Sequence, residues 1–256
     1  MSLDYPTMIR LFSQIIWPMG RIGGLVLTVP FFSSVLIPKR VKVFFVCILS
    51  WACADFVPAE LSFLQFNGMY VVYIIQEVFL GILMGFVLQL VFQVFVLGGQ
   101  IISMQAGLGF AVMVDPSSKA SVPLVSQFYL MMTTLIFLSL NGHLALLDAV
   151  MEGFKLMPVG QVTIDNALVW RVILFSGWMF KEAVLISIPA ILSLLIVSLS
   201  FGIMTRVAPQ LNIFSLGFPI TLLMAFVIIK IGLVGIGAQI TESIEEGMHM
   251  LIGLIR

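Results

Sequence analysis

Charged side chains interrupt the long apolar runs of this chain, and they are the first candidates for chemistry. Glu77 lies well inside the apolar run 70–97. The other charges placed in this way are Arg21, Lys181, Glu182 and Lys230. A carboxylate removed from water is costly unless it is paired or neutralised, so we expect Glu77 to face protein or a water-filled cavity. It can then serve either ion transport or a buried ion pair with Arg21 or Lys181, and both interpretations stay open.

His143 is a candidate for two kinds of chemistry, a proton relay in a transporter and catalysis in a protease. In an ion-coupled secondary transporter it would form a proton relay with Glu77 and the Lys181-Glu182 pair, although the two halves of the chain show no convincing internal repeat. A single histidine near a helix end is more often a hydrogen-bonded interfacial residue.

An intramembrane serine protease would pair His143 with Ser176-Gly177, but Leu174 stands where rhomboid-type enzymes carry glycine. The sequence carries no metal-ligand cluster, Walker loop or dinucleotide fingerprint. We therefore expect no enzymatic activity and no cofactor.

The stretch 98–123, GGQIISMQAGLGFAVMVDPSSKASVP, breaks the apolar pattern in the middle of the chain. Its glycines and prolines permit or impose irregular backbone, and Asp115-Pro116 marks a turn. Its apolar residues include Phe110, Val112, Met113 and Val114. Irregular backbone that is this apolar is tolerated when it is buried in protein or lines a cavity. The stretch is therefore predicted to be a loop folded into a pore or protein cavity.

Composition places the chain among integral membrane proteins. Hydrophobic residues make up 61% of its 256 residues, charged residues 9%, and the mean hydropathy is +1.19. Soluble domains carry about 25% charged residues. The apolar sequence suffices for about six helical spans of roughly 20 residues each. The zero formal net charge argues against a nucleic-acid partner.

We expect one all-α membrane domain whose long apolar helices form kinked hairpins. The predicted segments are 8–32, 43–57, 70–97, 124–140, 172–204 and 213–240. The fifth is longer than a bilayer requires, so it must tilt, kink or project from the membrane. The short turn 205–212 makes the fifth and sixth segments an antiparallel hairpin. Residues 151–171 are predicted to be an interfacial loop, and residues 241–256 an amphipathic helix.

Loop charges predict the orientation. If the N-terminus lies outside, Lys155 and Arg171 fall outside together with most acidic residues, whereas the other basic residues of the loops fall on the cytoplasmic side. These basic residues are Lys39, Arg40, Lys42, Lys119 and Arg206. Both termini are then expected to be periplasmic.

Three motifs carry a family resemblance. Residues 105–116 contain QAGLGFA followed by DP, residues 141–143 read NGH, and residues 206–219 read R-x-A-P-Q-x-N-x-F-x-x-G-F-P. With these motifs, and with a matching length and segment order, the chain resembles the FliR/SctT family of flagellar and injectisome export-gate proteins. The form Gly217-Phe218-Pro219 is more similar to the flagellar members.

The resemblance implies a subunit of the flagellar type III export gate, assembled with FliP and FliQ and contacted by FlhB. It would lie in the bacterial inner membrane at the flagellar basal body, where unfolded flagellar subunits pass. It also implies long split hairpins raised largely out of the bilayer plane. Residues 1–170 would be a FliP-like part with the central loop 98–123, and residues 171–256 a FliQ-like hairpin and tail.

By the same resemblance, the central loop plugs the closed channel. Met104, Phe110 and Met113 are bulky or deformable side chains that can seal against ions and still yield to an unfolded chain. Gly107 and Gly109 would give the loop freedom to move. The full set predicted for the plug is Met104, Gly107, Gly109, Phe110, Val112, Met113, Asp115 and Pro116.

The turn before the last segment is the predicted contact for a cytoplasmic-side partner, FlhB by the resemblance. Its residues are Arg206, Pro209, Gln210 and Asn212. Amide side chains can bond free backbone groups at helix ends, while Arg206 remains available for an acidic partner.

Overall fold

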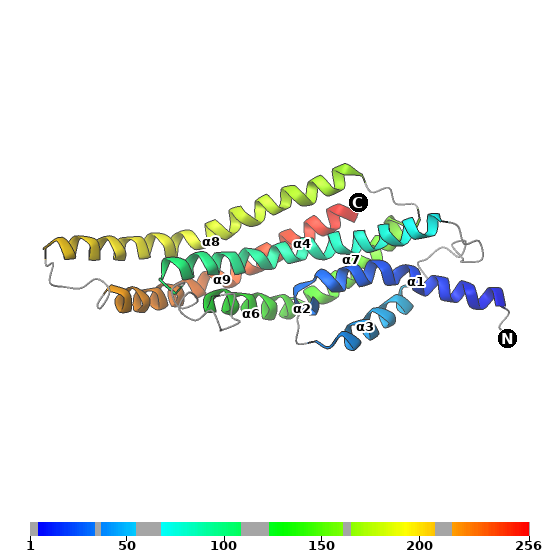
Figure 1. Ribbon diagram of the computed structural model, residues 1–256, viewed down its shortest axis with the longest axis horizontal. Helices are drawn as coiled ribbons and strands as arrows, with labels where there is room; N and C mark the ends of the chain where they lie inside the picture. Colours follow the sequence, from blue (N-terminus) through cyan, green and yellow to red (C-terminus); the bar gives the residue numbers. More distant parts are fainter. Residues whose placement is uncertain are drawn as a thin grey trace. The chain divides into compact units, whose positions relative to one another are not determined.

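The computed structural model describes residues 5–33, 37–54, 68–108, 123–160, 165–207 and 217–255, and the regular structure in these ranges is helical (Figure 1). The all-α expectation is therefore confirmed for the described residues. The helices are α1 (Tyr5–Thr28), α2 (Pro30–Ser33), α3 (Lys39–Ala52), α4 (Met69–Gln105), α6 (Leu124–Ser139), α7 (Gly142–Leu156), α8 (Asn166–Val207) and α9 (Phe218–Ile255).

Three of these helices, α4, α8 and α9, are long and apolar enough to cross a membrane. The pair α6 and α7 passes the same test together, with a bend of 66° between its members. The expected count of six long helices is not confirmed, because the described residues contain three, or four if the bent pair is one span. One reason is that α3 has only 14 residues, a length of about 21 Å against a hydrocarbon core of about 30 Å.

The central loop begins later than predicted. Helix α4 continues through residues 98–105, which were expected to be loop. The paired glycines serve close packing here: a Cβ added to Gly99 would lie 2.7 Å from the Cα of Ser126 on α6. A Cβ on Gly98 would lie 3.4 Å from the carbonyl oxygen of Ala183 on α8. Because these glycines let neighbouring helices approach α4, they support the helix instead of ending it.

Two other boundaries also differ from the expectation. Both ends of the stretch 151–171, which is predicted to be an interfacial loop, are helical, since α7 extends to Leu156 and α8 begins at Asn166. The tail 241–256 is not a separate helix, because α9 continues to Ile255.

The tail is amphipathic as predicted. Ile244 and Leu251 are buried, whereas Glu242 and Glu245 are exposed. This part of α9 therefore packs one face against the protein.

The contacts divide the chain into two compact units. Unit 1 comprises residues 1–90, 141–176 and 244–256, and unit 2 comprises residues 91–140 and 177–243. Helices α4, α8 and α9 contribute residues to both. The predicted division of the chain at residue 170, into a FliP-like part and a FliQ-like part, concerns likeness to other subunits. It is a different division from these two units, and it stays a prediction.

Each unit has its own core. In unit 1, Trp17 is fully buried, and its ring stacks on Tyr70 with 5.6 Å between the centroids. In unit 2, the rings of Phe92 and Phe137 meet edge to face at 5.6 Å. Within unit 2, α8 and α9 run in opposite directions (Figure 1), as the predicted hairpin requires.

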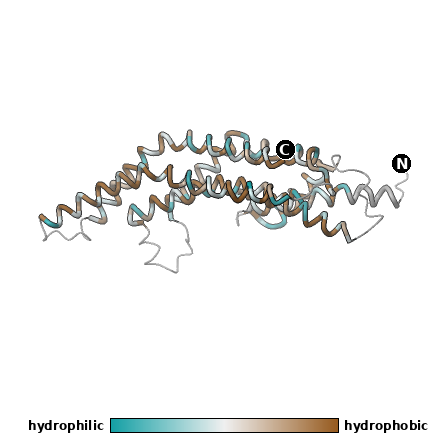
Figure 2. Tube along the Cα trace, turned by 90° about the horizontal axis from the view of Figure 1, so that it is seen from above, coloured by the Kyte–Doolittle hydropathy of each residue, from teal (hydrophilic) through white to brown (hydrophobic). Residues whose placement is uncertain are grey.

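Helices α8 and α9 expose much of their apolar surface. Figure 2 shows apolar residues along these helices, yet only 11% of the most apolar window of each is buried, against 61% for α4. Apolar faces of this size require a covering of lipid or of other protein chains. The chain is therefore a membrane protein, as its composition indicates.

Candidate functional site

A buried ion pair joins α1 to α4 in unit 1. Arg21 and Glu77 are each 1% exposed. The Arg21 Nε donates a hydrogen bond to Glu77 Oε2 at 2.8 Å, and Nη2 donates to Oε1 at 3.1 Å. This two-point contact of guanidinium with carboxylate is the strong form of the interaction. The prediction that Glu77 faces protein is confirmed, and of its two candidate partners the structure selects Arg21.

Helix α7 completes the surroundings of Arg21. Its Nη2 also donates to the carbonyl oxygen of Met157 at 3.0 Å, just beyond the end of α7. The carbonyls at a helix C-terminus carry partial negative charge, which favours a cation there. The Arg21 Cζ lies 4.2 Å from the ring centroid of Phe154, which adds a cation–π contact. One buried cation therefore connects three helices.

Glycines allow the two helices to approach closely enough for this pair. A Cβ on Gly81 would overlap the carbonyl oxygen of Arg21, and a Cβ on Gly24 would overlap the carbonyl oxygen of Val78. A Cβ on Gly85 would overlap the Thr28 hydroxyl. The close-packing face expected from the glycines near Glu77 is present, and α1 is the helix packed against it.

The other predicted membrane charges have different surroundings. Lys181 Nζ lies 3.5 Å from Glu182 Oε1, and the lysine side chain is 69% exposed, so this is a surface pair. Lys230 is exposed, and the described residues give it no ion-pair partner. The His143 Nδ1 is buried without a hydrogen-bond partner among the described residues. No described set of three His, Cys, Asp or Glu residues could hold a metal.

The stem of the central loop, at the end of α4 in unit 2, is well defined. The N–H of Gly107 donates to Met104 O at 3.1 Å, and the N–H of Leu108 donates to Ser103 O at 3.0 Å. Gly107 has φ +80°. This pattern is a Schellman motif, which ends a helix at a left-handed residue. The predicted role of Gly107 in loop movement stays a prediction, whereas in the structure its positive φ ends α4 in one defined conformation.

Side chains from the hairpin hold this stem. Leu108 packs against a buried cluster that includes Leu194 of α8 and Ala225 of α9. The ring of Phe218 lies beside Gly107, where an added Cβ would be 3.2 Å from Phe218 Cε2. Two sequence motifs that are far apart in the chain thus meet at the stem.

The remaining predicted site residues divide between described and undescribed parts. Met104, in the last turn of α4, is 73% exposed, and Arg206 is exposed near the end of α8. The plug residues outside the described residues are Gly109, Phe110, Val112, Met113, Asp115 and Pro116. The turn residues Pro209, Gln210 and Asn212 also lie outside them.

Sequence reasoning missed several partners. Phe154 and Met157 were not expected near Arg21, because an aromatic ring and a backbone carbonyl carry no charge signal in a sequence. Phe218 stood in a motif, but nothing in the motif indicates that it contacts Gly107.

Comparisons with known proteins agree with the motifs. A family model described as bacterial export proteins, family 1, matches residues 12–247. The flagellar biosynthetic protein FliR of Buchnera aphidicola subsp. Baizongia pistaciae is 33% identical over 217 residues, which cover 84% of each chain. FliR of Escherichia coli K12 is 33% identical over 207 residues, 80% of this chain and 78% of the relative. FliR of Aquifex aeolicus is 32% identical, with 83% and 82% covered. The chain therefore belongs to family 1 of the bacterial export proteins.

Proposed function

We propose that this protein is a membrane subunit of the flagellar type III export gate, where it forms with FliP and FliQ the channel for unfolded flagellar subunits. The observation that carries the proposal is the likeness to proteins named FliR, at 33% identity over about four fifths of the chain. The exposed apolar faces of α8 and α9 support it, because such faces need partner chains or lipid. We place the protein in the inner membrane at the flagellar basal body, without a catalytic step or a cofactor of its own.

Purification tests this role. A gate subunit should be recovered with FliP and FliQ as one large complex after mild solubilisation, and it should contact FlhB. The competing role, an ion-coupled secondary transporter that uses Glu77, His143 and Lys181, predicts transport by the isolated protein in vesicles. Both oxygens of Glu77 accept hydrogen bonds from Arg21, so the carboxylate is already paired within the protein. Ion-coupled uptake without FliP and FliQ would contradict the gate role.

We further propose that the central loop closes the pore through the bulk of its side chains. The defined stem at Gly107 supports this role, because it gives the loop a fixed starting point on α4. Burying a side chain such as Phe110 or Met113 contributes about 1.5–3 kcal/mol. A solvent-exposed pair of Asp115 with Lys119 would contribute at most about 1 kcal/mol. Side-chain bulk is therefore the stronger sealing force.

A deletion variant and a charge variant test whether side-chain bulk or charge seals the pore. Removing 109–119 keeps the stem residues Gly107 and Leu108, so the complex should assemble, but membranes that contain it should conduct small ions. The matched control replaces Asp115 and Lys119 together by serine and should stay nearly as tight as wild type. Conductance across planar bilayers measures both. An assembled deletion variant that remains tight would exclude the plug role.

The turn before α9 is proposed to contact FlhB on the cytoplasmic side. Arg206 is exposed near the end of α8, where it can reach an acidic partner. The proposed contact also includes Pro209, Gln210 and Asn212. Cysteines placed at Thr205 or Gln210 should cross-link to FlhB in assembled complexes, whereas a cysteine at Met69, at the opposite end of α4 from the loop stem, should not. If neither turn position cross-links, the assignment of this turn is wrong.

A further inference from the structure

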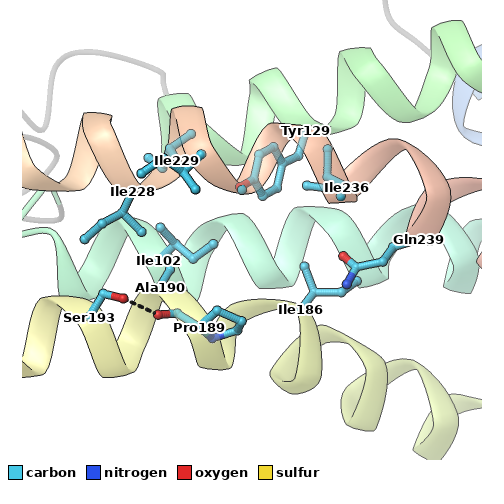
Figure 3. A pocket seen from close by; sticks show the side chains of 13 residues that line it. Ile102, Tyr129, Ile186, Pro189, Ala190, Ser193, Ile228, Ile229, Ile236 and Gln239 are labelled. Atoms are coloured by element: carbon cyan, nitrogen blue, oxygen red, sulfur yellow. Dashed lines mark hydrogen bonds between the residues drawn. The ribbon is translucent and has the colours of Figure 1, made fainter.

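A cavity of about 230 Å³ lies in unit 2 between α4, α6, α8 and α9 (Figure 3). Its walls are mostly aliphatic and include Ile102, Ile186, Ala190, Ile228, Ile229 and Ile236. For comparison, an apolar protein cavity of about 150 Å³ stays dry and binds benzene. This cavity is therefore large enough for a hydrocarbon ligand.

Small and irregular residues create this space. Pro189 interrupts the hydrogen bonding of α8, and Ser193 donates to its carbonyl oxygen at 2.8 Å, as Figure 3 shows. On α9, Gly232 and Gly235 line the cavity, and a Cβ added to either glycine would have no atom within 4 Å. At these two positions the cavity wall carries no side chain, whereas a larger residue there would occupy part of the cavity.

Three polar side chains line this mostly apolar space, Tyr129, Ser193 and Gln239. Tyr129 is 3% exposed and lines the cavity, and Figure 3 shows it projecting from α6 toward the isoleucines of the wall. The described residues give its hydroxyl no hydrogen bond, and the hydroxyl oxygen is not among the buried atoms without a partner, so it is accessible from the cavity. An accessible phenol hydroxyl at the wall of a mostly apolar cavity is placed to donate a hydrogen bond to a bound ligand.

The opening of the cavity meets an apolar surface. Ile231, a lining residue on α9, is 69% exposed, and Leu192 of α8 and Val227 of α9 are 55% and 49% exposed. Both helices are long and apolar enough to cross a membrane. The surface around the opening is therefore continuous with faces that can meet lipid hydrocarbon.

We propose that the cavity binds one acyl chain of a membrane glycerophospholipid, and that the Tyr129 hydroxyl donates a hydrogen bond to the ester carbonyl oxygen of that chain. The isoleucine walls supply the apolar contact, and the two glycines leave room for the methylenes. The bound chain fills a space among four helices and so stabilises unit 2.

Photolabelling tests the site. The probe is a diester phosphatidylethanolamine with a diazirine within one acyl chain, presented to the full-length protein in its purified complex, in nanodiscs of phosphatidylethanolamine and phosphatidylglycerol. The label should attach to 186–193 or 228–239. Gly235→Leu, which places a side chain in the cavity, should lower this labelling at least tenfold. Gly237→Leu is the matched control, since it lies on the same helix outside the lining and its Cβ also meets no atom within 4 Å.

Absent labelling in these ranges would overturn the proposal, because water or a partner side chain would then occupy the cavity. Equal labelling of the two leucine variants would also overturn it.

A lipid without the ester carbonyl tests the hydrogen bond. As competitors of the probe, diester phosphatidylethanolamine should be about two- to tenfold more effective than its diether analogue on the wild-type protein. Tyr129→Phe removes only the hydroxyl and should abolish this preference while the labelled peptides stay the same. An unchanged preference in Tyr129→Phe would refute the assignment of Tyr129 as the donor.

Discussion

Replacing Glu77 by leucine will leave the buried guanidinium of Arg21 without its carboxylate. The variant loses both hydrogen bonds, at 2.8 and 3.1 Å, and the cation stays 1% exposed. Removing one partner of a buried pair typically costs about 3–5 kcal/mol. The Met157 carbonyl and the Phe154 ring still stabilise the cation, so we expect the lower half of that range.

Thermal unfolding of the purified protein in detergent measures this loss. For a chain of this size, each kcal/mol corresponds to about 2–4 °C in Tm, so Glu77→Leu should lower Tm by about 6–16 °C. Glu77→Gln keeps an acceptor oxygen of similar shape and should lose about half as much. Glu245→Leu replaces an exposed glutamate and should change the stability by about 0.5 kcal/mol at most.

A double variant tests the physical reason. Arg21→Met with Glu77→Leu removes both charges, and replacing a buried pair by apolar residues of similar volume is often neutral or stabilising. The double variant should therefore melt well above Glu77→Leu. If Glu77→Gln and Glu77→Leu melt at the same temperature, only the charge matters and the hydrogen-bond argument fails. If the double variant melts as low as Glu77→Leu, an unpaired buried cation is not the cause of the loss.

Further substitutions test the packing of the helices and the stem. Gly81→Ala places a Cβ on a backbone oxygen of α1 and should cost about 1–3 kcal/mol of stability in the same melting assay. The control Gly23→Ala, whose added Cβ has no atom within 4 Å, should be neutral or stabilising. Equal effects of the two substitutions would refute the close contact between α1 and α4. Gly107→Ala should cost about 1–2 kcal/mol, because φ is +80° there, and an unchanged Tm would show that the stem adapts. Burial raises the pKa of the Cys53 thiol, so less of the reactive thiolate is present at neutral pH. Maleimide should therefore modify Cys53 at least tenfold more slowly than Cys47, and the rate at Cys53 should rise with pH. Equal modification rates of the two cysteines, measured by mass spectrometry, would contradict the packing of α3.

Helix positions were the most predictable feature, because apolar runs bounded by prolines and polar clusters show directly in the sequence. The run 124–140 corresponds closely to α6, and the run 70–97 marks most of α4. The predicted end of α4 is eight residues too early, at 97 and not at Gln105, since glycines at 98 and 99 indicate a break when read alone. They are compatible with a helix because Ser126 and Ala183 pack closely against them. A glycine gives the same local signal in a loop and at a helix contact.

Among the candidate site residues, too, some features could be predicted from the sequence and others could not. The burial of Glu77 follows from its place in an apolar run, since an unpaired carboxylate is too costly there. Its partner does not follow, because Arg21 and Lys181 carry the same charge. The structure selects Arg21 because Gly24 and Gly81 bring α1 against α4, and it leaves Lys181 on the surface beside Glu182.

By itself, the sequence determined the membrane class, the helical content and the export family, because composition, hydrophobic runs and motifs are local properties of the chain. Only the tertiary structure decided which distant residues meet. Phe218 lies against Gly107 at the stem, and Tyr129 lines a cavity together with Gly232 and Gly235 of another helix. Such contacts depend on how helices are rotated and packed against one another, and neither hydropathy nor spacing along one helix specifies that arrangement.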